Sequence, residues 1–174
     1  MGAGHSTTLA LRAVQANGTG SVLCIDPHAP PSLQSLNGPI EILPQAVQEV
    51  PDSLFLELSP SDILFIDGSH ICKTGSDVNH LFLRILPKLP KGVLVHIHDV
   101  CLPFEYPKQW SKEVLCYWNE QYVLAGLLAN STKYRVLVGV YFLQKTDERV
   151  LLPFLPNVPG VFPGGGSVWL QSLE

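Results

Sequence analysis

Charged residues are scarce in this chain, and charge of neither sign is concentrated along it. Of its 174 residues, 15% are charged and 46% are hydrophobic, and the formal net charge is −4. The Lys and Arg residues form no run that would make a basic patch. We therefore expect no nucleic-acid partner, because binding a phosphate backbone needs concentrated positive charge. A folded domain that binds a small or neutral ligand fits this composition better.

Cysteine is also sparse, and no two cysteines form a CxxC pair. They stand at positions 24, 72, 101 and 116, a spacing that suits neither a zinc knuckle nor a disulfide framework. Reduced thiols in a cytoplasmic protein are expected. The sequence has no apolar run of 18 residues and no basic start followed by an apolar stretch. It therefore predicts neither a membrane span nor a signal peptide.

Short apolar runs are present instead, and they recur along the chain. We predict strands at 21–26, 39–43, 62–67, 93–98, 134–143 and 166–171. The nearly continuous apolar character of the earlier runs is typical of strands buried on both faces, as in a parallel sheet. Residues 144–165 are rich in Pro and Gly and show no period, so we expect a long loop or an insertion before the last strand.

Helical spacing of apolar residues appears between these strands. It predicts helices at 6–17, followed by Gly18 as the C′ residue, at 77–86, which stops before Pro87, and at 112–129. Strands that alternate with helices imply right-handed crossovers. The expected fold is α/β, a Rossmann-like three-layer sandwich whose mostly parallel sheet ends in an antiparallel C-terminal edge. We expect residues 1–174 to form a single domain.

A glycine-containing segment precedes the first helix. Gly2 and Gly4 would let the backbone approach a ligand closely, and the helix start at Ser6 offers free amide groups. Asp26 ends the next strand, where nucleotide-binding α/β folds place an acid that accepts hydrogen bonds from ribose hydroxyls. A turn cap beside the following proline is the alternative role for Asp26. A dinucleotide dehydrogenase would use the same pair, but its third glycine is replaced here by Thr7.

Acids and imidazoles follow two later strands. Asp67 and His70 end the run that begins at residue 62, and His98 and Asp99 end the run that begins at residue 93. Ligands of open α/β sheets bind outside the carboxyl ends of the strands, so these side chains are expected to share one crevice. A divalent cation or a proton-transfer step needs such a cluster. His96 lies deeper in its strand and is more readily explained as a core histidine.

Five segments together resemble a known family. They are Gly2-Ala-Gly-His-Ser6, Ile25-Asp-Pro-His28, Phe65-Ile-Asp-Gly-Ser-His70, His96-Ile-His-Asp99 and Trp118-Asn-Glu-Gln-Tyr122. The chain resembles class I methyltransferases with a methyltransferase-24-type domain, including cephalosporin hydroxylase-like and sugar O-methyltransferase sequences. The resemblance implies S-adenosylmethionine-dependent transfer of a methyl group to an oxygen of a small molecule such as a sugar or natural product. It covers nearly the whole chain.

The resemblance also implies roles for individual residues. Gly2, Gly4, Ser6 and Asp26 would hold the cofactor, and His70 or Asp67 would take the proton of the acceptor hydroxyl. Asp67 and Asp99 match positions that hold magnesium in metal-dependent relatives. His98 stands where those relatives often have a further acid. The expected metal ligands are therefore Asp67, His98 and Asp99. Binding of a cation such as Mg²⁺ stays an open alternative.

One departure from the family concerns the start of the chain. The family's first strand, which leads into the glycine segment, has no counterpart before Gly2, so an N-terminally truncated domain is expected. A non-catalytic remnant without cofactor and a nicotinamide-dependent oxidoreductase are the alternatives to an active methyltransferase. The expected partner is a small-molecule acceptor, and self-association into a homo-oligomer is an open alternative.

Overall fold

The structure, a computed structural model, describes residues 4–154 and 165–174. The chain divides into two compact units, Met1–Pro51 and Asp52–Glu174. Both units contain strands and helices, so the expected α/β class is confirmed. Within the described ranges, no helix is long and apolar enough to cross a membrane.

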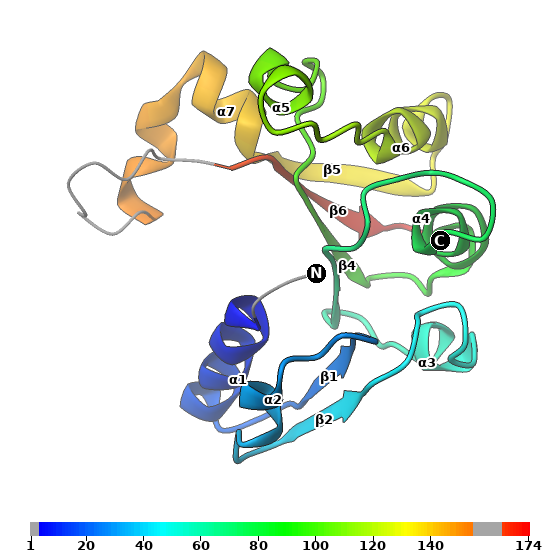
Figure 1. The fold of residues 1–174 in the computed structure, drawn as a ribbon, viewed down its shortest axis with the longest axis vertical. Coiled ribbons are helices and arrows are strands. Elements are labelled where there is room, and N and C mark those ends of the chain that lie inside the picture. Colours follow the sequence, from blue (N-terminus) through cyan, green and yellow to red (C-terminus); the bar gives the residue numbers. More distant parts are fainter. Residues whose placement is uncertain (1–3, 155–164) are drawn as a thin grey trace. The chain divides into compact units, whose positions relative to one another are not determined.

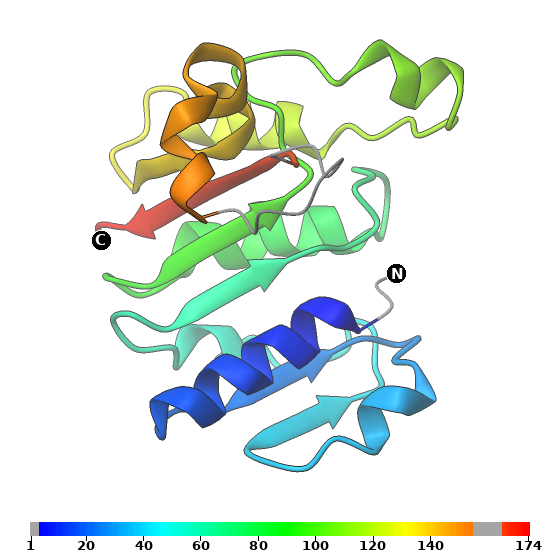
Figure 2. The ribbon, with the colours of Figure 1, turned by 90° about the vertical axis from the view of Figure 1, so that its left-hand side faces the viewer.

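The N-terminal unit is a two-stranded parallel sheet with helices. Its elements are α1 (His5–Asn17), β1 (Val22–Ile25), α2 (Pro31–Gln34) and β2 (Ile40–Leu43). β1 and β2 run parallel, and α1 lies against β1 (Figure 2). α1 ends where Gly18 takes a left-handed φ of 68° and its N–H bonds to the carbonyl of Val14. Because glycine pays no Cβ penalty in that conformation, the predicted end of the helix is confirmed.

The C-terminal unit contains the remaining elements. Its strands are β3 (Ile63–Ile66), β4 (Leu94–His98), β5 (Tyr134–Gly139) and β6 (Ser167–Ser172). Its α-helices are α3 (Ser53–Leu56), α4 (Asp77–His80), α5 (Lys108–Lys112), α6 (Glu120–Leu128) and α7 (Val140–Thr146). Its π and 3₁₀ turns are η1 (Leu81–Ile85), η2 (Leu86–Lys88), η3 (Glu148–Val150) and η4 (Leu152–Phe154).

The four strands of this unit form one sheet in the order β3-β4-β6-β5. β3 and β4 are parallel, whereas β6 lies between β4 and β5 and is antiparallel to both (Figure 1). The antiparallel C-terminal edge is therefore confirmed. The two parallel strands direct their carboxyl ends to the same edge of the sheet, and the loops after β3 and β4 emerge there.

The two faces of this sheet differ in how far they are covered. α4, η1 and α6 lie on one face and α7 on the other (Figures 1 and 2). The residues of the first face form a dry core with 0% exposure, including Val95, Ile97, Leu170, Phe82, Ile85 and Leu124. On the second face Phe65, His96 and Trp169 stand side by side in register, and Phe65 is 39% exposed. Complete burial on both faces was thus wrong for β3 and β4.

Two predicted elements also have different bounds. The helix predicted at 112–129 begins at Glu120, since Leu115 has a left-handed φ of 59° and residues 113–119 are not helical. The strand predicted at 134–143 ends at Gly139, and α7 begins directly after it. Apolar spacing alone did not distinguish these conformations, because both segments carry apolar side chains without a clear period. The predicted loop at 144–165 includes the end of α7, η3 and η4 before the residues that lie outside the description.

Candidate functional site

A tight turn at the end of β3 presents Asp67 and His70. Asp77, the first residue of α4, accepts a 2.7 Å hydrogen bond from the Ser69 N–H and a further one from the Ser69 hydroxyl. A Cβ on Gly68 would lie 2.1 Å from an Asp77 carboxylate oxygen. Only glycine therefore allows Asp77 to reach the turn and fix it.

The loop after β4 presents Asp99. Its N–H donates a 2.6 Å hydrogen bond to the carbonyl of Gly166, which directly precedes β6. Asp99 and His70 both have left-handed φ values, 56° and 59°. Such a conformation is unfavourable for a residue with a Cβ and persists where surrounding contacts enforce it, often at functional sites. Both loops therefore hold a polar residue in a strained conformation at the same edge of the sheet.

Four side chains, from the end of β4 and from the loops after β3 and β4, lie together. His70 Nε2 is 3.4 Å from Asp67 Oδ1 and 3.8 Å from Asp99 Oδ2. His98 Nδ1 is 3.2 Å from Asp99 Oδ2 and 3.9 Å from Asp67 Oδ1. One ligand atom each from Asp67, His70 and Asp99 falls within 4.8 Å of the other two. The structure thus brings the predicted catalytic and metal residues of the C-terminal unit into one group, which we call the acid–imidazole cluster.

Glu120, which sequence reasoning missed, lies behind His70. Its Oε1 accepts a 2.5 Å hydrogen bond from His70 Nδ1, and Glu120 is 1% exposed. The ring of Trp118 packs on His70 with 4.3 Å between centroids. The imidazole is therefore held from two sides with its Nε2 directed at Asp67 and Asp99. The available signal was a Glu-Gln pair at the start of an otherwise apolar stretch, 120–128.

The segment 118–121, which we call the clasp, binds both loops of the cluster. The N–H groups of Asn119 and Glu120 donate to the carbonyl of His70 at 3.0 and 3.3 Å. Gln121 Oε1 accepts from the Cys101 N–H at 3.0 Å, and Gln121 Nε2 donates to the Phe104 carbonyl at 3.3 Å. Gln121 is 1% exposed. One short segment thus fixes the positions of the loops that carry His70 and Asp99.

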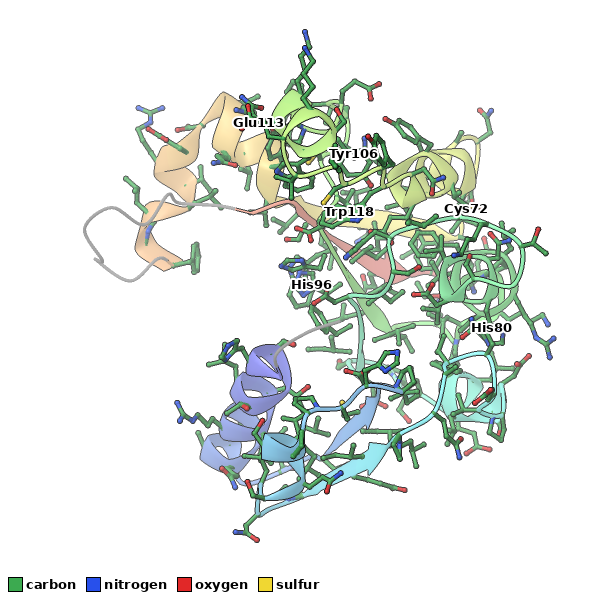
Figure 3. All side chains as sticks on the ribbon, in the orientation of Figure 1. Cys72, His80, His96, Tyr106, Glu113 and Trp118 are labelled. Atoms are coloured by element: carbon green, nitrogen blue, oxygen red, sulfur yellow. The ribbon has the colours of Figure 1, made fainter. Side chains whose placement is uncertain are left out.

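Aromatic side chains surround the clasp. Trp118 lies 5.1 Å from Trp110 and 6.5 Å from Tyr106 between ring centroids, and Figure 3 shows Trp118 and Tyr106 close together. Tyr122 packs edge-on against Tyr106, and its hydroxyl donates a 2.6 Å hydrogen bond to Glu105. These contacts among the rings give the aromatic residues a packing role beside the cluster.

Burial and neighbouring charges shift the pKa values of the residues in the cluster. Burial lowers the pKa of His70, but its contacts with Asp67 and Glu120 and the charge of Asp99 outweigh burial and raise that pKa to about 9. Contact with His70 lowers the pKa of Asp67, and contact with Asp99 raises that of His98. Burial raises the pKa of Glu120, against the opposing effect of His70. The imidazoles therefore attract a positive charge, whether a proton or a metal ion.

His96 occupies the sheet next to the cluster. Its ring stacks on Trp169 with centroids 4.2 Å apart and lies 5.0 Å from Phe65. Its Nε2 is buried and has no hydrogen-bond partner among the described residues. Burial, followed by the charge of His98, lowers the pKa of His96 to about 4. His96 is thus a neutral packing residue, as expected, although its ring is not fully hydrogen-bonded.

The predicted cofactor residues belong to the N-terminal unit. Gly4 is buried and precedes α1 with a left-handed φ of 77°, and a Cβ there would lie 2.7 Å from Leu33. Ser6 is exposed in the first turn of α1. Asp26 follows β1, and its Oδ1 accepts a 2.8 Å hydrogen bond from the N–H of His28, the turn contact expected as its alternative role. Gly2 lies outside the described residues.

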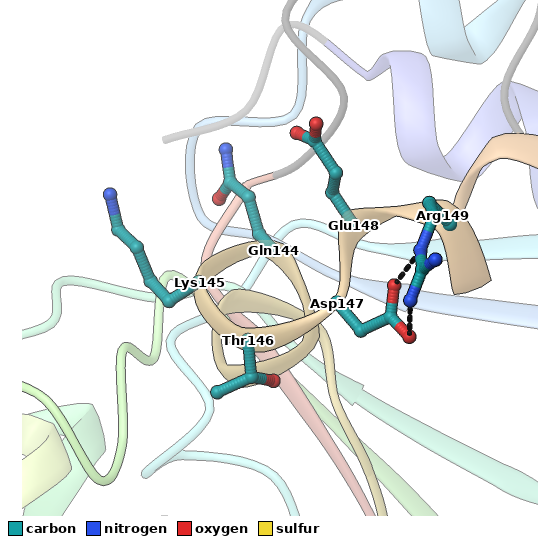
Figure 4. A pocket seen from close by; sticks show the side chains of 6 residues that line it. All are labelled: Gln144, Lys145, Thr146, Asp147, Glu148 and Arg149. Atoms are coloured by element: carbon teal, nitrogen blue, oxygen red, sulfur yellow. Dashed lines mark hydrogen bonds and ion pairs between the residues drawn. The ribbon is translucent and has the colours of Figure 1, made fainter.

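A surface hollow is lined by residues 144–149 at the end of α7 (Figure 4). Its Arg149 is paired with Asp147 through contacts of 2.7 and 3.0 Å. The hollow contains none of the predicted site residues, and its guanidinium is already neutralised. The hollow is therefore a weaker candidate for a functional site than the acid–imidazole cluster.

Comparison with known proteins identifies the family. A family model described as a methyltransferase domain matches residues 1–100. The chain belongs to this methyltransferase family. Comparisons with curated proteins and with solved structures gave no significant match. All the predicted site residues fall inside the matched part of this methyltransferase domain, whereas the clasp lies beyond it.

Membership of the family supports a methyltransferase enzyme in general terms. S-adenosylmethionine is the general methyl donor of this class. The acid–imidazole cluster is therefore the leading place to look for the chemistry of the acceptor, because it gathers the titratable side chains at one sheet edge.

Proposed function

We propose that the chain transfers a methyl group from S-adenosylmethionine to a hydroxyl oxygen of a small molecule, such as a sugar or natural product. The observation that carries this proposal is the acid–imidazole cluster of Asp67, His70, His98 and Asp99 in a chain of the methyltransferase family. An oxygen nucleophile must lose a proton during methylation, and this cluster supplies groups that accept one.

The reaction is an in-line displacement at the sulfonium methyl. The acceptor oxygen forms a bond to the methyl carbon, the carbon–sulfur bond breaks, and its electron pair stays on sulfur to give S-adenosylhomocysteine. The proton of the hydroxyl passes to a carboxylate of Asp67, or to the imidazole of His70 when that ring is in its neutral form; these are the two proton acceptors that we propose. Much of the rate of such a reaction comes from alignment of oxygen, carbon and sulfur. The loops of the cluster are held firmly by hydrogen bonds, as such alignment requires.

For the cofactor, we propose contacts with the N-terminal unit. Gly2 and Gly4 would allow close approach of the backbone, and the N–H groups near Ser6 at the start of α1 would serve as donors. Asp26, at the carboxyl end of β1, would accept hydrogen bonds from the ribose hydroxyls. The bond from the His28 N–H occupies Oδ1 of Asp26, so Oδ2 is the oxygen assigned to ribose.

A divalent cation fits the donor chemistry of the cluster. Asp67 and Asp99 offer carboxylate oxygens, and His98 Nδ1 is buried without a hydrogen-bond partner among the residues described. These three residues would hold the ion. When bound, the ion would lower the pKa of the acceptor hydroxyl and fix its position.

A thermal-shift measurement tests the class of cofactor. S-adenosylhomocysteine should raise the melting temperature of the full chain, because a ligand that binds only the folded state stabilises it. NAD at the same concentration should leave the melting temperature unchanged. A shift with NAD alone would indicate an oxidoreductase, and no shift with either ligand would indicate a domain that does not bind a cofactor.

A further inference from the structure

We propose that Asp67, His70, His98 and Asp99 together form a nitrogen–oxygen site for a divalent transition-metal ion, with Glu120 as the positioning residue of the His70 ligand. The proposal deepens the function given above and rests on it only for the role of the ion in methyl transfer. It enlarges the expected ligand set by His70, and it changes the expected ion.

The distances between the ring nitrogens and the carboxylate oxygens suit ligands of one ion. Each carboxylate oxygen lies between 3.2 and 3.9 Å from both ring nitrogens. Nitrogen and oxygen ligands of zinc sit about 2.0–2.2 Å from the metal, so two of them at a tetrahedral angle are about 3.4 Å apart. Ligand atoms of Asp67, His70 and Asp99 lie within 4.8 Å of one another, and His98 Nδ1 adds contacts of 3.2 and 3.9 Å with the two carboxylates.

Hydrogen bonding does not account for this arrangement. N–H···O hydrogen bonds span about 2.7–3.2 Å, and both contacts of His70 Nε2 are longer, at 3.4 and 3.8 Å. The His70 side chain is only 8% exposed, so its Nε2 has little access to water. His98 Nδ1 is buried and likewise without a hydrogen-bond partner in the described part of the chain. His70 Nε2 is therefore aimed at two carboxylates beyond hydrogen-bond distance, and His98 Nδ1 approaches Asp99 Oδ2 at 3.2 Å without meeting the geometry of a hydrogen bond.

Glu120 gives His70 the surroundings of a metal ligand. Metal-bound histidines generally donate their other ring N–H to a carboxylate or carbonyl, which fixes the tautomer and the ring orientation. His70 Nδ1 makes this contact with Glu120 at 2.5 Å. Glu120 is 1% exposed, and its Oε2 has no hydrogen-bond partner within the described residues. A buried carboxylate in this position is costly unless it serves the imidazole in front of it.

The donor set selects the kind of ion. Imidazole suits zinc, iron, nickel and copper, whereas Mg²⁺ prefers carboxylate, carbonyl and water oxygens in octahedral geometry. Two nitrogens and two oxygens therefore favour a transition-metal ion such as Zn²⁺ over Mg²⁺. With His70 as a ligand through Nε2, Asp67 Oδ2 is left as the group that takes the proton of the acceptor hydroxyl.

Titration of the metal-free full chain with Co²⁺ tests the site without a methyl acceptor. We expect one equivalent to bind with a ligand-field absorption band in the visible, Zn²⁺ to displace it, and a large excess of Mg²⁺ not to. His70→Ala and His98→Ala should each weaken binding by more than Glu120→Gln, for which the loss of an outer-shell carboxylate predicts about 10- to 100-fold. His28→Ala, which removes an exposed histidine outside the cluster, is the matched control and should bind as the wild type does.

Three results would overturn the proposal: no stoichiometric Co²⁺ binding, displacement of Co²⁺ by equimolar Mg²⁺, or unchanged affinity in both histidine variants. Circular dichroism of each variant checks that it is folded. If His70→Ala unfolds, His98→Ala carries the test, because that side chain is 42% exposed. S-adenosylhomocysteine binding is measured on the same samples. If S-adenosylhomocysteine binds and Co²⁺ does not, only the metal site is contradicted. If Co²⁺ binds and S-adenosylhomocysteine does not, only the proposed function is contradicted.

Discussion

At the residue scale, His96 combines a polar ring with an aromatic environment. It stacks on Trp169 and approaches Phe65, and its Nε2 lacks a hydrogen-bond partner among the described residues. Burial lowers its pKa to about 4. The folded protein therefore disfavours the charged imidazole, whereas the unfolded chain titrates near the ordinary value of about 6.5.

His96 should consequently make the protein sensitive to mild acid. Because the pKa of His96 is lower in the folded state, protonation of the unfolded chain destabilises the folded protein. This loss of stability is absent above about pH 6.5 and grows as the pH falls toward 4. We expect His96→Phe, which keeps the ring contacts, to lose less free energy of unfolding than the wild type between pH 7 and pH 5. Urea unfolding of the metal-free proteins at both pH values measures this difference. An equal loss in the two proteins would show that His96 is not kept neutral by folding.

At the element scale, the clasp connects the start of α6 to the two loops of the cluster. Its Gln121 side chain is 1% exposed and bonds to the backbone of Cys101 and Phe104. Removing it leaves the buried Cys101 N–H and the partly exposed Phe104 carbonyl without these partners. The loss of a partner costs about 1–3 kcal/mol at a buried group such as the Cys101 N–H.

We therefore predict that Gln121→Ala lowers the free energy of unfolding by about 1–3 kcal/mol. Gln109→Ala, at an exposed position of α5, is the matched control and should change it by less than about 0.5 kcal/mol. Chemical denaturation of both variants makes the comparison. Equal stabilities would mean that the loops do not depend on the clasp.

The sequence predicted the elements whose signal is local. The helix ending at Gly18 and the strands around Ile63 and Leu94 follow from turn chemistry and apolar runs, and their order implied that the side chains after β3 and β4 would share an edge. The clasp was not predicted, because the conformation of residues 113–119 depends on contacts between Asn119 and Glu120 and the distant His70 carbonyl. Glu120 was missed for the same reason. Its role exists only through a partner 50 positions earlier.

At the scale of the whole molecule, the exposed edge of a sheet offers a place for two copies of the chain to associate. β3 ends the four-stranded sheet, and its Ile63 and Phe65 are 55% and 39% exposed. An apolar edge strand offers unpaired backbone groups to a second chain, and natural proteins often blunt such edges with lysine. The homo-oligomer considered from the sequence could form through this edge.

Light scattering over a concentration series tests this idea. We expect the mean mass of the wild type to rise with concentration and that of Ile63→Lys to stay at the monomer value. Leu9→Lys is the control, because it replaces a side chain that is 64% exposed on α1 rather than on a strand. A wild type that remains monomeric throughout would remove the β3 edge from consideration.

The proposed function requires that the family's methyl donor binds this chain. Calorimetric titration with S-adenosylhomocysteine tests that claim most directly, using Asp26→Ala and the control Glu41→Ala, an exposed acid on β2. We predict that the wild type and the Glu41 variant bind with equal affinity. The Asp26 variant should bind about 1–3 kcal/mol more weakly, the cost of leaving a polar group without its partner. A folded wild-type chain that gives no binding heat at any accessible concentration would contradict the proposed function. Unchanged affinity in Asp26→Ala would remove that residue from the cofactor site.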